Sequence, residues 1–178
     1  TGVHGILSGT STTDFGGADH YVGALKAAIL SVSTQIAIVD ISHEIPAHDV
    51  LEAGWVLLNA FGTFPGRTVH VAVADPGVGT SRRPIVAVAR DHLFVGPDNG
   101  IFSFIWEVAP PSHVYHITAS HYMRSPVSDT FHARDIFGPV AAHLARGIEA
   151  SNIGDPIEDY VRLDVSRPRV MQEGLVKA

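Results

Sequence analysis

The sequence predicts an α/β fold with a mainly parallel central sheet. Two short runs rich in Val and Ala, at 68–74 and 84–89, are typical of strands that are buried on both faces. Such runs alternate along the chain with stretches that repeat apolar residues at helical spacing, as expected of an α/β domain. Of the 178 residues, 46% are hydrophobic and 17% are charged, which favours a compact globule over a disordered chain.

The first half of the chain contains two expected helices, each with a recognisable start. Asp19 precedes a run of apolar residues at helical spacing, where a carboxylate interacts favourably with the N-terminal end of the helix dipole. Asp49 followed by Glu52 resembles a capping box ahead of a strongly apolar stretch. The elements expected here are a strand at 3–8, a helix at 21–30, a strand at 36–41 and a helix at 50–61.

The second half continues the alternation and then weakens. Pro139 is expected to break or restart the last helix in its first turns. The expected elements are strands at 68–74, 84–89, 93–95 and 113–117, short helices at 101–106 and from 136 to about 147, and an edge strand at 161–165. The prediction is therefore one three-layer, Rossmann-like domain over residues 1–160, with 161–178 as a linker or the start of a further unit.

The composition excludes several classes of function. The formal net charge is −6 and the lysines are limited to Lys26 and Lys177, so no basic surface for nucleic acid or anionic membrane is expected. No apolar run reaches the roughly 18 residues that a membrane span needs, and no secretory signal is visible after Thr1. The chain has no cysteine, which excludes disulfides and thiolate chemistry. A cytoplasmic protein fits this composition.

The run between the two Val- and Ala-rich strands is the first candidate for a functional site. Asp75 ends one strand, a Pro-Gly pair turns the chain, and Arg82 and Arg83 precede the next strand. Ligands of open α/β sheets bind outside the carboxyl ends of the strands, so Asp75 and Arg82 are candidates. The alternative is an ordinary glycine-rich connection with solvated arginines.

Familiar nucleotide motifs do not explain this run. No phosphate-binding GxxxxGK loop is present, and Arg82 stands where a dinucleotide fingerprint needs its third glycine. The histidines lack the spacing of a metal site, so no metal is expected. The polar loop residues that remain are Asp14, Asp19, Asp75, Arg82, Asn99, His132 and Arg134. Each also has a structural alternative: Asp14 as a helix cap, Asn99 in a left-handed turn, and Arg134 paired with Asp135 or Glu107.

Five short blocks, in order and suitably spaced, resemble one known family. The blocks are 12–16 (TTDFG), 40–46 (DISHEIP), 75–83 (DPGVGTSRR), 96–100 (GPDNG) and 131–135 (FHARD). Over residues 5–165 the chain resembles the S-adenosyl-L-methionine (SAM) hydroxide adenosyltransferases, or SAM hydrolases, relatives of the fluorinases and chlorinases. The resemblance implies that water or hydroxide attacks the ribose C5′ of SAM and yields adenosine and methionine, with no cofactor. A sulfonium leaves as a neutral thioether, so the catalyst must mainly place the water and exclude solvent.

The matching positions imply the residues of the reaction. Asp75, Arg82 and His132 correspond to the set that members using water carry: Arg82 would favour hydroxide, and Asp75 and His132 would orient the water or accept its proton. Ala133 stands where halogenating relatives have a serine, which favours hydrolysis over halide transfer.

The same matching implies contacts to the rest of the substrate. Asp14 would bind the ribose hydroxyls and Asp19 the amino group of the methionine portion. Val78 would line the ribose pocket. His48 would lie beside the adenosyl group, where relatives have Gln or Trp, so the local packing there is open.

Members of the family continue into a smaller C-terminal β domain, which contributes to the site across a trimer interface. The present sequence stops about where that domain would begin. A homotrimer with the site at a subunit interface is therefore implied by the resemblance. Two alternatives remain open: a non-catalytic module that binds adenosine or SAM, and halide-dependent adenosyl transfer.

Overall fold

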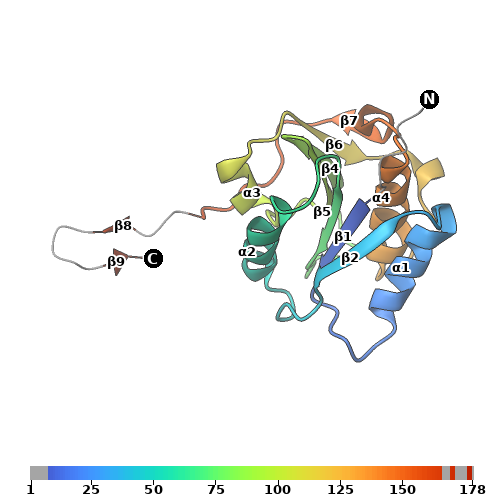
Figure 1. Cartoon of the computed structure of the whole chain (residues 1–178), viewed down its shortest axis with the longest axis horizontal. Coiled ribbons are helices and arrows are strands. Elements are labelled where there is room, and N and C mark those ends of the chain that lie inside the picture. Colours follow the sequence, from blue (N-terminus) through green and yellow to red (C-terminus); the bar gives the residue numbers. More distant parts are fainter. Residues whose placement is uncertain (1–7, 166–168, 171–175, 178) are drawn as a thin grey trace.

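The computed structural model describes residues 8–165, 169–170 and 176–177, and its body is a sheet between two helical layers (Figure 1). The sheet has seven strands in the order β2-β1-β3-β5-β4-β6-β7. Its strands are β1 (Ser8–Thr13), β2 (Ala37–Ser42), β3 (Val69–Val73), β4 (Pro84–Ala89), β5 (His92–Pro97), β6 (His113–Ile117) and β7 (Gly154–Pro156). A separate antiparallel pair consists of β8 (Arg169–Val170) and β9 (Val176–Lys177).

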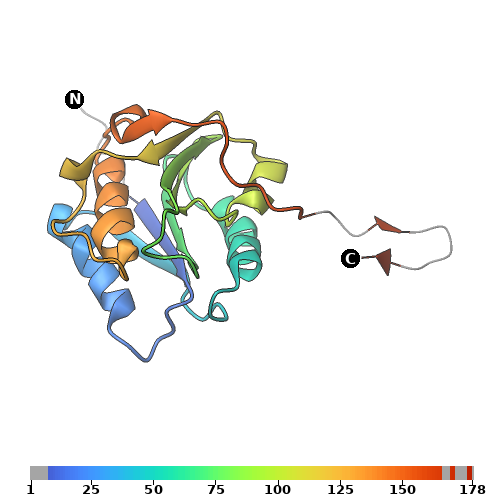
Figure 2. The same cartoon turned by 180° about the vertical axis from the view of Figure 1, so that it is seen from behind.

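Helices cover both faces of the sheet, which confirms the α/β class. The helices are α1 (Tyr21–Val32), α2 (Val50–Phe61), α3 (Ser103–Val108) and α4 (Gly138–Ala145), with short turns η1 (Ser120–Tyr122), η2 (Ala133–Phe137) and η3 (Ala150–Asn152). Figures 1 and 2 show α1 and α4 against one face and α2 and α3 against the other. Each face has its own apolar core, which includes Phe137 on the α1/α4 side and Phe94 on the α2/α3 side. No helix in the described part of the chain is long and apolar enough to cross a membrane.

The sheet is mixed, and the prediction of a mainly parallel sheet is not confirmed. The pairs β1–β2, β1–β3 and β3–β5 are parallel, whereas β4–β5, β4–β6 and β6–β7 are antiparallel. The reason lies in the connection between β4 and β5, which consists of Arg90 and Asp91 alone. Two residues close an antiparallel hairpin, whereas a parallel connection needs a crossover of a dozen or more.

The first described strand differs from the expected one. Residues 1–7, which include most of the strand expected at 3–8, lie outside the described residues, and β1 covers a stretch expected to be a polar loop. Neighbouring strands supply partners for two of its buried hydroxyls: Thr10 Oγ1 lies 2.8 Å from His70 Nδ1, and Ser11 Oγ donates to Asp40 Oδ1 at 2.8 Å, whereas Thr12 Oγ1 has no partner among the described groups. Polar residues with such partners fit a buried strand that pairs on both sides.

Two expectations at the C-terminal end have different outcomes. Pro139 stands in the first turn of α4, directly after the π-helical turn η2, so the predicted restart of the helix is confirmed. The prediction of an edge strand at 161–165 is wrong, because this segment forms no strand pairing. Its main chain instead donates to side chains: Val161 N to Asp98 Oδ1 and Leu163 N to Ser103 Oγ, both at 2.8 Å.

Candidate active site

A cavity of about 300 Å³ lies beyond the carboxyl ends of β1 and β3. Its walls come from segments far apart in the sequence, which the parallel half of the sheet brings to one edge. Six of the eight predicted site residues line it: Asp14, His48, Asp75, Val78, His132 and Ala133. A larger hollow of about 750 Å³ is lined by residues of 65–67, 88–93 and 144–150, and none of the predicted site residues is part of it.

Asp75 and Arg82 form an ion pair at this edge. Their atoms Oδ1 and Nε lie 2.9 Å apart, with the Asp75 side chain 5% exposed and that of Arg82 27% exposed. The N–H of Gly77 donates to the same Asp75 oxygen at 2.9 Å. The Nε of Arg82 is itself buried and has no acceptor in hydrogen-bond geometry among the described groups. Arg82 therefore holds Asp75 by charge, from just outside the cavity lining, and keeps an unused N–H.

Two glycines let this loop close on itself and on its neighbour. A Cβ at Gly77 would overlap the guanidinium of Arg82, so only glycine lets the arginine fold back toward Asp75. Gly79 has a φ of +79°, and a Cβ there would overlap the main-chain carbonyl of Asp129. Through Gly79 the loop packs directly against the segment that leads to His132.

The segment before His132 is fixed by a buried carboxylate. Asp135 is 1% exposed and accepts from Arg134 Nε and Nη2, at 2.7 and 2.8 Å, and from Ser128 N at 2.9 Å. Burial raises the pKa of the Asp135 carboxyl, but the hydrogen bonds from Arg134 and Ser128 outweigh this effect and hold that pKa below its usual value. The pairing of Arg134 with Asp135 is confirmed, so Arg134 has a structural role. His132 precedes the π-helical turn and is half-buried at the cavity.

Asp14 follows β1 directly and lines the cavity next to the end of β3, where its main-chain N–H donates to the carbonyl of Val73 at 3.3 Å. Its Oδ2 accepts from the main-chain N–H of His48 at 2.8 Å, and its side chain is 9% exposed. His48 adopts a φ of +67°, which turns its N–H toward this carboxylate. Asp14 does not cap α1, whose preceding residue is His20, so the alternative role as a cap is wrong. Within the described residues, its Oδ1 accepts no hydrogen bond.

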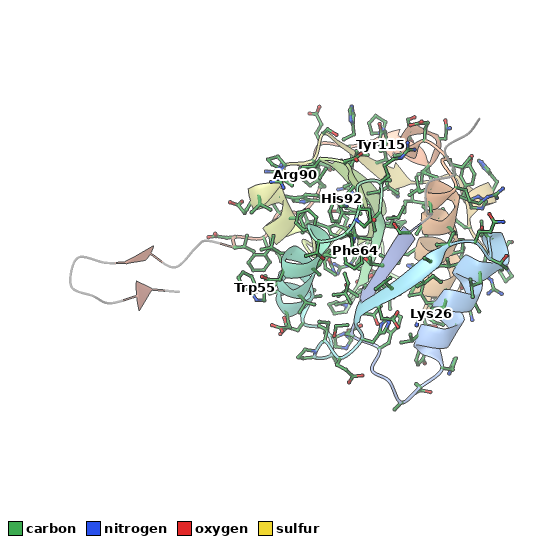
Figure 3. The ribbon with its side chains drawn as sticks, viewed as in Figure 1. Lys26, Trp55, Phe64, Arg90, His92 and Tyr115 are labelled. Atoms are coloured by element: carbon green, nitrogen blue, oxygen red, sulfur yellow. The ribbon has the colours of Figure 1, made fainter. Side chains whose placement is uncertain are left out.

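A polar network holds the end of β1 that carries Asp14. His43 bridges Asp40 Oδ1, 3.0 Å from its Nε2, and Thr13 Oγ1, 2.7 Å from its Nδ1. Lys26, whose side chain is labelled beside α1 in Figure 3, donates from Nζ to Asp40 Oδ2 at 2.5 Å. Burial raises the pKa of Asp40, but hydrogen bonds from Lys26, His43 and Ser11 outweigh it and lower that pKa to about 2. Asp40 is therefore a carboxylate at neutral pH and anchors the network.

Asp19, a predicted site residue, lies away from the cavity. Its side chain is 68% exposed, lies 3.5 Å from His20 Nδ1 and does not line the cavity. The turn between Gly16 and α1 faces solvent, which accounts for this position.

Sequence reasoning missed the structural roles of two residues behind the cavity. Asn99 is buried, and its Nδ2 donates to the carbonyl of Ala74 at 2.8 Å; the left-handed position expected for Asn99 is taken by Gly100, with a φ of +88°. Arg83 is not the solvated arginine of an ordinary connection, because it donates to Asp98 Oδ2 through Nε and Nη2, at 3.1 and 2.7 Å. No local signal predicts these pairings, which join separate loops.

Aromatic side chains were also missed. Phe15, Tyr21 and Phe131 line the cavity. Phe15 and Phe131 are adjacent to predicted site residues, which is a signal that could have found them, whereas Tyr21 was assigned only to a helix face. The described residues hold no group of three or more His, Asp or Glu side chains arranged for a metal ion.

Comparison with known proteins places the chain in a family. Residues 10–154 match the family model described as the SAM hydroxide adenosyltransferase N-terminal domain. The (R)-S-adenosyl-L-methionine hydrolase of Thermus thermophilus is 37% identical over 171 residues, covering 91% of this chain and 65% of the relative. That of Salinispora tropica is 39% identical over 166 residues, covering 92% and 63%.

The chain is also similar to a more distant group of enzymes and to a solved structure. A fluorinase of Actinoplanes is 22% identical over 189 residues and is covered to 63%. A crystal structure of an uncharacterized conserved protein from Thermotoga maritima superposes with a TM-score of 0.89 at 39% identity, covering 93% of this chain and 63% of the other. The chain thus spans less than two thirds of the length of these relatives. It belongs to the SAM hydroxide adenosyltransferase family, of which it contains the N-terminal domain.

Proposed function

We propose that this chain is the SAM-cleaving part of a SAM hydrolase, which converts SAM and water to adenosine and methionine. The observation that carries the proposal is the convergence of Asp14, Asp75 and His132 on one cavity, with Arg82 paired to Asp75. Relatives that bear the name (R)-S-adenosyl-L-methionine hydrolase support the same activity.

The proposed mechanism follows from the charges at the cavity. A water near Asp75 and His132 is oriented by their acceptors, while the positive charge of Arg82, paired with Asp75, lowers the cost of hydroxide character. The new bond forms between the water oxygen and C5′, and the C5′–S bond breaks with its electron pair remaining on sulfur. The water proton passes to His132 or Asp75, and the thioether leaves without protonation. No cofactor takes part in this scheme.

Asp14 fits the ribose in this proposal. One of its oxygens is fixed by His48 N–H, and the other is free of hydrogen bonds within the described chain, as a carboxylate that accepts from a hydroxyl requires. Val78 and Ala133 supply apolar wall nearby. Ala133 offers no hydroxyl donor for a halide, which favours water as the nucleophile.

The parts of SAM other than the ribose and the reacting carbon need binding groups beyond those of this cavity. A cavity of about 300 Å³ is at the low end of the roughly 300–1,000 Å³ of ligand pockets. We propose that a C-terminal β domain and a homotrimer complete the site at a subunit interface, as the resemblance implies, and that Asp19 meets the methionine amino group only in that assembly. A cytoplasmic location remains a prediction from composition.

The test is product analysis with the full-length gene product. Incubation with SAM in H₂¹⁸O should give adenosine and methionine in equal amounts, with the label in adenosine. Arg82→Ala, His132→Ala and Asp75→Asn should each lower kcat by roughly 10²–10³-fold, as loss of a proton acceptor or an electrostatic stabiliser does. Arg146→Ala, an exposed arginine after α4, is the matched control and should leave the rate unchanged.

Other outcomes would select the alternatives. Tight binding of SAM by calorimetry without any adenosine would indicate a binding module. A 5′-halo-5′-deoxyadenosine formed in the presence of halide would indicate adenosyl transfer to halide. Label in methionine, or full activity in Arg82→Ala, would contradict the proposed mechanism.

A further inference from the structure

Three aromatic rings form one side of the cavity. The ring centroids of Phe15, Tyr21 and Phe131 lie 5.0 Å apart for Tyr21–Phe131 and 5.9 Å apart for the other two pairs. All three side chains line the cavity, on segments that come from the β1–α1 loop, the first turn of α1 and the residue before His132. We refer to Phe15, Tyr21 and Phe131 as the aromatic wall.

The three rings of the aromatic wall differ in the side chains that already pack on their faces. The guanidinium carbon of Arg134 lies over Phe131, 5.0 Å from the ring centroid, so a cation already occupies this ring. The His20 ring stacks on Tyr21 at 4.6 Å, yet Tyr21 remains 39% exposed. Phe15 is half-buried at the cavity. Phe15 and Tyr21 are therefore the rings that remain open to a ligand.

The charge around the cavity favours a cationic ligand. Two nearly buried carboxylates face it, Asp14 and Asp75; Arg82 pairs with Asp75, while the group that faces Asp14 is the imidazole of His48, with Nδ1 3.9 Å from Oδ2. The chemistry of the proposed function puts a cation here, because the carbon that water attacks is bonded directly to the sulfonium sulfur. The polar groups of the cavity serve the ribose and the water, so the wall left for the sulfonium is aromatic. Aromatic faces bind cations within about 6 Å of the ring centroid.

We propose that Phe15 and Tyr21 bind the sulfonium of the substrate by cation–π contact and thereby distinguish SAM from neutral thioethers such as S-adenosylhomocysteine. This inference rests on the proposed function. The discrimination is by charge, because the two compounds share the adenosyl group and the amino acid and differ in one methyl group and its positive charge.

The position of this contact on the reaction path follows from the same charge. When the C5′–S bond breaks, its electron pair returns to sulfur and the positive charge disappears. The contact is thus strongest in the bound substrate, weaker in the transition state and absent with the thioether product. It contributes to the binding of SAM and to the release of methionine, and it does not accelerate the chemical step.

The experiment compares Tyr21→Leu with Tyr21→Phe in the full-length protein. Phenylalanine keeps the ring and leucine keeps apolar bulk at the start of α1, so the pair isolates the aromatic face. Calorimetry measures binding of SAM, S-adenosylhomocysteine and adenosine, and steady-state kinetics measures KM and kcat. Tyr21→Leu should weaken SAM binding and raise its KM by about 3- to 30-fold, and kcat should stay level or rise, because the lost contact is weaker in the transition state than in the bound substrate. Binding of the two neutral compounds should change by less than about twofold, and Tyr21→Phe should resemble the parent.

Two results would overturn the inference. In the first, Tyr21→Leu weakens the binding of SAM and of S-adenosylhomocysteine equally, which indicates an apolar wall without charge recognition. In the second, Tyr21→Leu leaves the affinity for SAM unchanged. The failure of the proposed function is a separate result, because it is the absence of adenosine from the parent protein. The binding comparison does not need turnover, so it decides the role of the aromatic wall in either case.

Discussion

The side-chain amide of Asn99 donates a 2.8 Å hydrogen bond to the main-chain carbonyl of Ala74, the residue that precedes Asp75. The Asn99 Oδ1 in turn accepts from Ile101 N at 3.1 Å. Both bonds are buried, so the turn after β5 fixes the end of β3 and, with it, the backbone from which Asp75 extends. The position of the proposed catalytic carboxylate therefore depends on a residue that does not line the cavity.

The first prediction concerns Asn99→Ala. The change leaves the Ala74 carbonyl and the Ile101 N–H unpaired in a buried setting, which should lower the free energy of unfolding by roughly 1–3 kcal/mol. The release of the β3 end should also lower kcat more than it changes KM. Urea unfolding and steady-state kinetics measure both effects. Asn59→Ala is the control, because its 2.7 Å bond to the carbonyl of Trp55 is exposed, so its effect on stability should be small. Equal effects of the two changes would contradict the anchoring role of Asn99.

The second prediction separates the two glycines of the loop at 75–83. Gly77→Ala should displace the guanidinium of Arg82, which is flexible, so activity should fall by at least about tenfold while stability changes little. Gly79→Ala meets the rigid main chain of Asp129 at a positive φ, so both stability and activity should fall.

Gly23→Ala is the matched control for both changes. Gly23 lies within α1 with open space around its Cα, so alanine there should raise stability by up to about 1 kcal/mol and leave activity unchanged. Thermal unfolding and adenosine formation measure the three variants. A Gly77→Ala protein with full activity would show that Arg82 does not need its present position.

Six of the eight residues predicted from the sequence line one cavity, whereas the prediction of a mainly parallel sheet is not confirmed, and particular residues explain the difference. Asp14 and Asp75 follow the parallel neighbours β1 and β3, so their place at one edge follows from the topology, whereas His132 precedes η2 and joins them only through the tertiary fold. The polar residues from Thr10 onward read locally as a loop, yet they belong to β1, which pairs with β2 and β3; His70 and Asp40 on these strands are partners for two of its hydroxyls. Arg83 finds its partners 15 and 76 positions away, which no local pattern indicates.

The third prediction concerns the pH dependence of stability. His70 is fully buried, with Thr10 Oγ1 at its Nδ1 and His92 Nδ1 3.1 Å from its Nε2, next to Phe61 and Phe64. Burial, and the nearby charge of His92, lower the pKa of His70 from 6.5 to about 3. In the unfolded chain the imidazole is protonated below about 6.5, so between 6.5 and about 3 the unfolded state binds more protons than the folded state.

The stabilising contribution of neutral His70 should therefore be complete above about pH 6.5 and should decline as the pH falls toward 3. The slope is on the order of 1.4 kcal/mol for each pH unit in this window. His70→Gln keeps a group that can pair with Thr10 but does not titrate, so its free energy of unfolding should depend less steeply on pH. Urea unfolding at pH 7, 5.5 and 4.5 compares the two proteins. Parallel curves would show that His70 does not titrate on unfolding.

The last prediction concerns Arg83, whose guanidinium joins three segments. It donates twice to Asp98, whose side chain is 3% exposed, and its Nη1 donates to Asp159 Oδ1 at 2.8 Å, where the side chain is 79% exposed. Asp98 also accepts from Val161 N, so the carboxylate holds the segment after β7 against the turn after β5. Burial opposes the charge of Asp98, and Arg83 is the cation that compensates for it.

Arg83→Gln should therefore lower the free energy of unfolding by about 3–5 kcal/mol, because it leaves a buried carboxylate without its partner. Asp159→Asn removes only the exposed half of the arrangement and should destabilise the protein much less than Arg83→Gln does. The double change Arg83→Gln with Asp98→Asn should recover part of the loss, because it removes the uncompensated charge as well. Urea unfolding of these variants gives the comparison. If Asp159→Asn destabilised the protein as much as Arg83→Gln, the exposed contact rather than the buried pair would hold the segment, and the assignment of Asp98 as the anchor would be wrong.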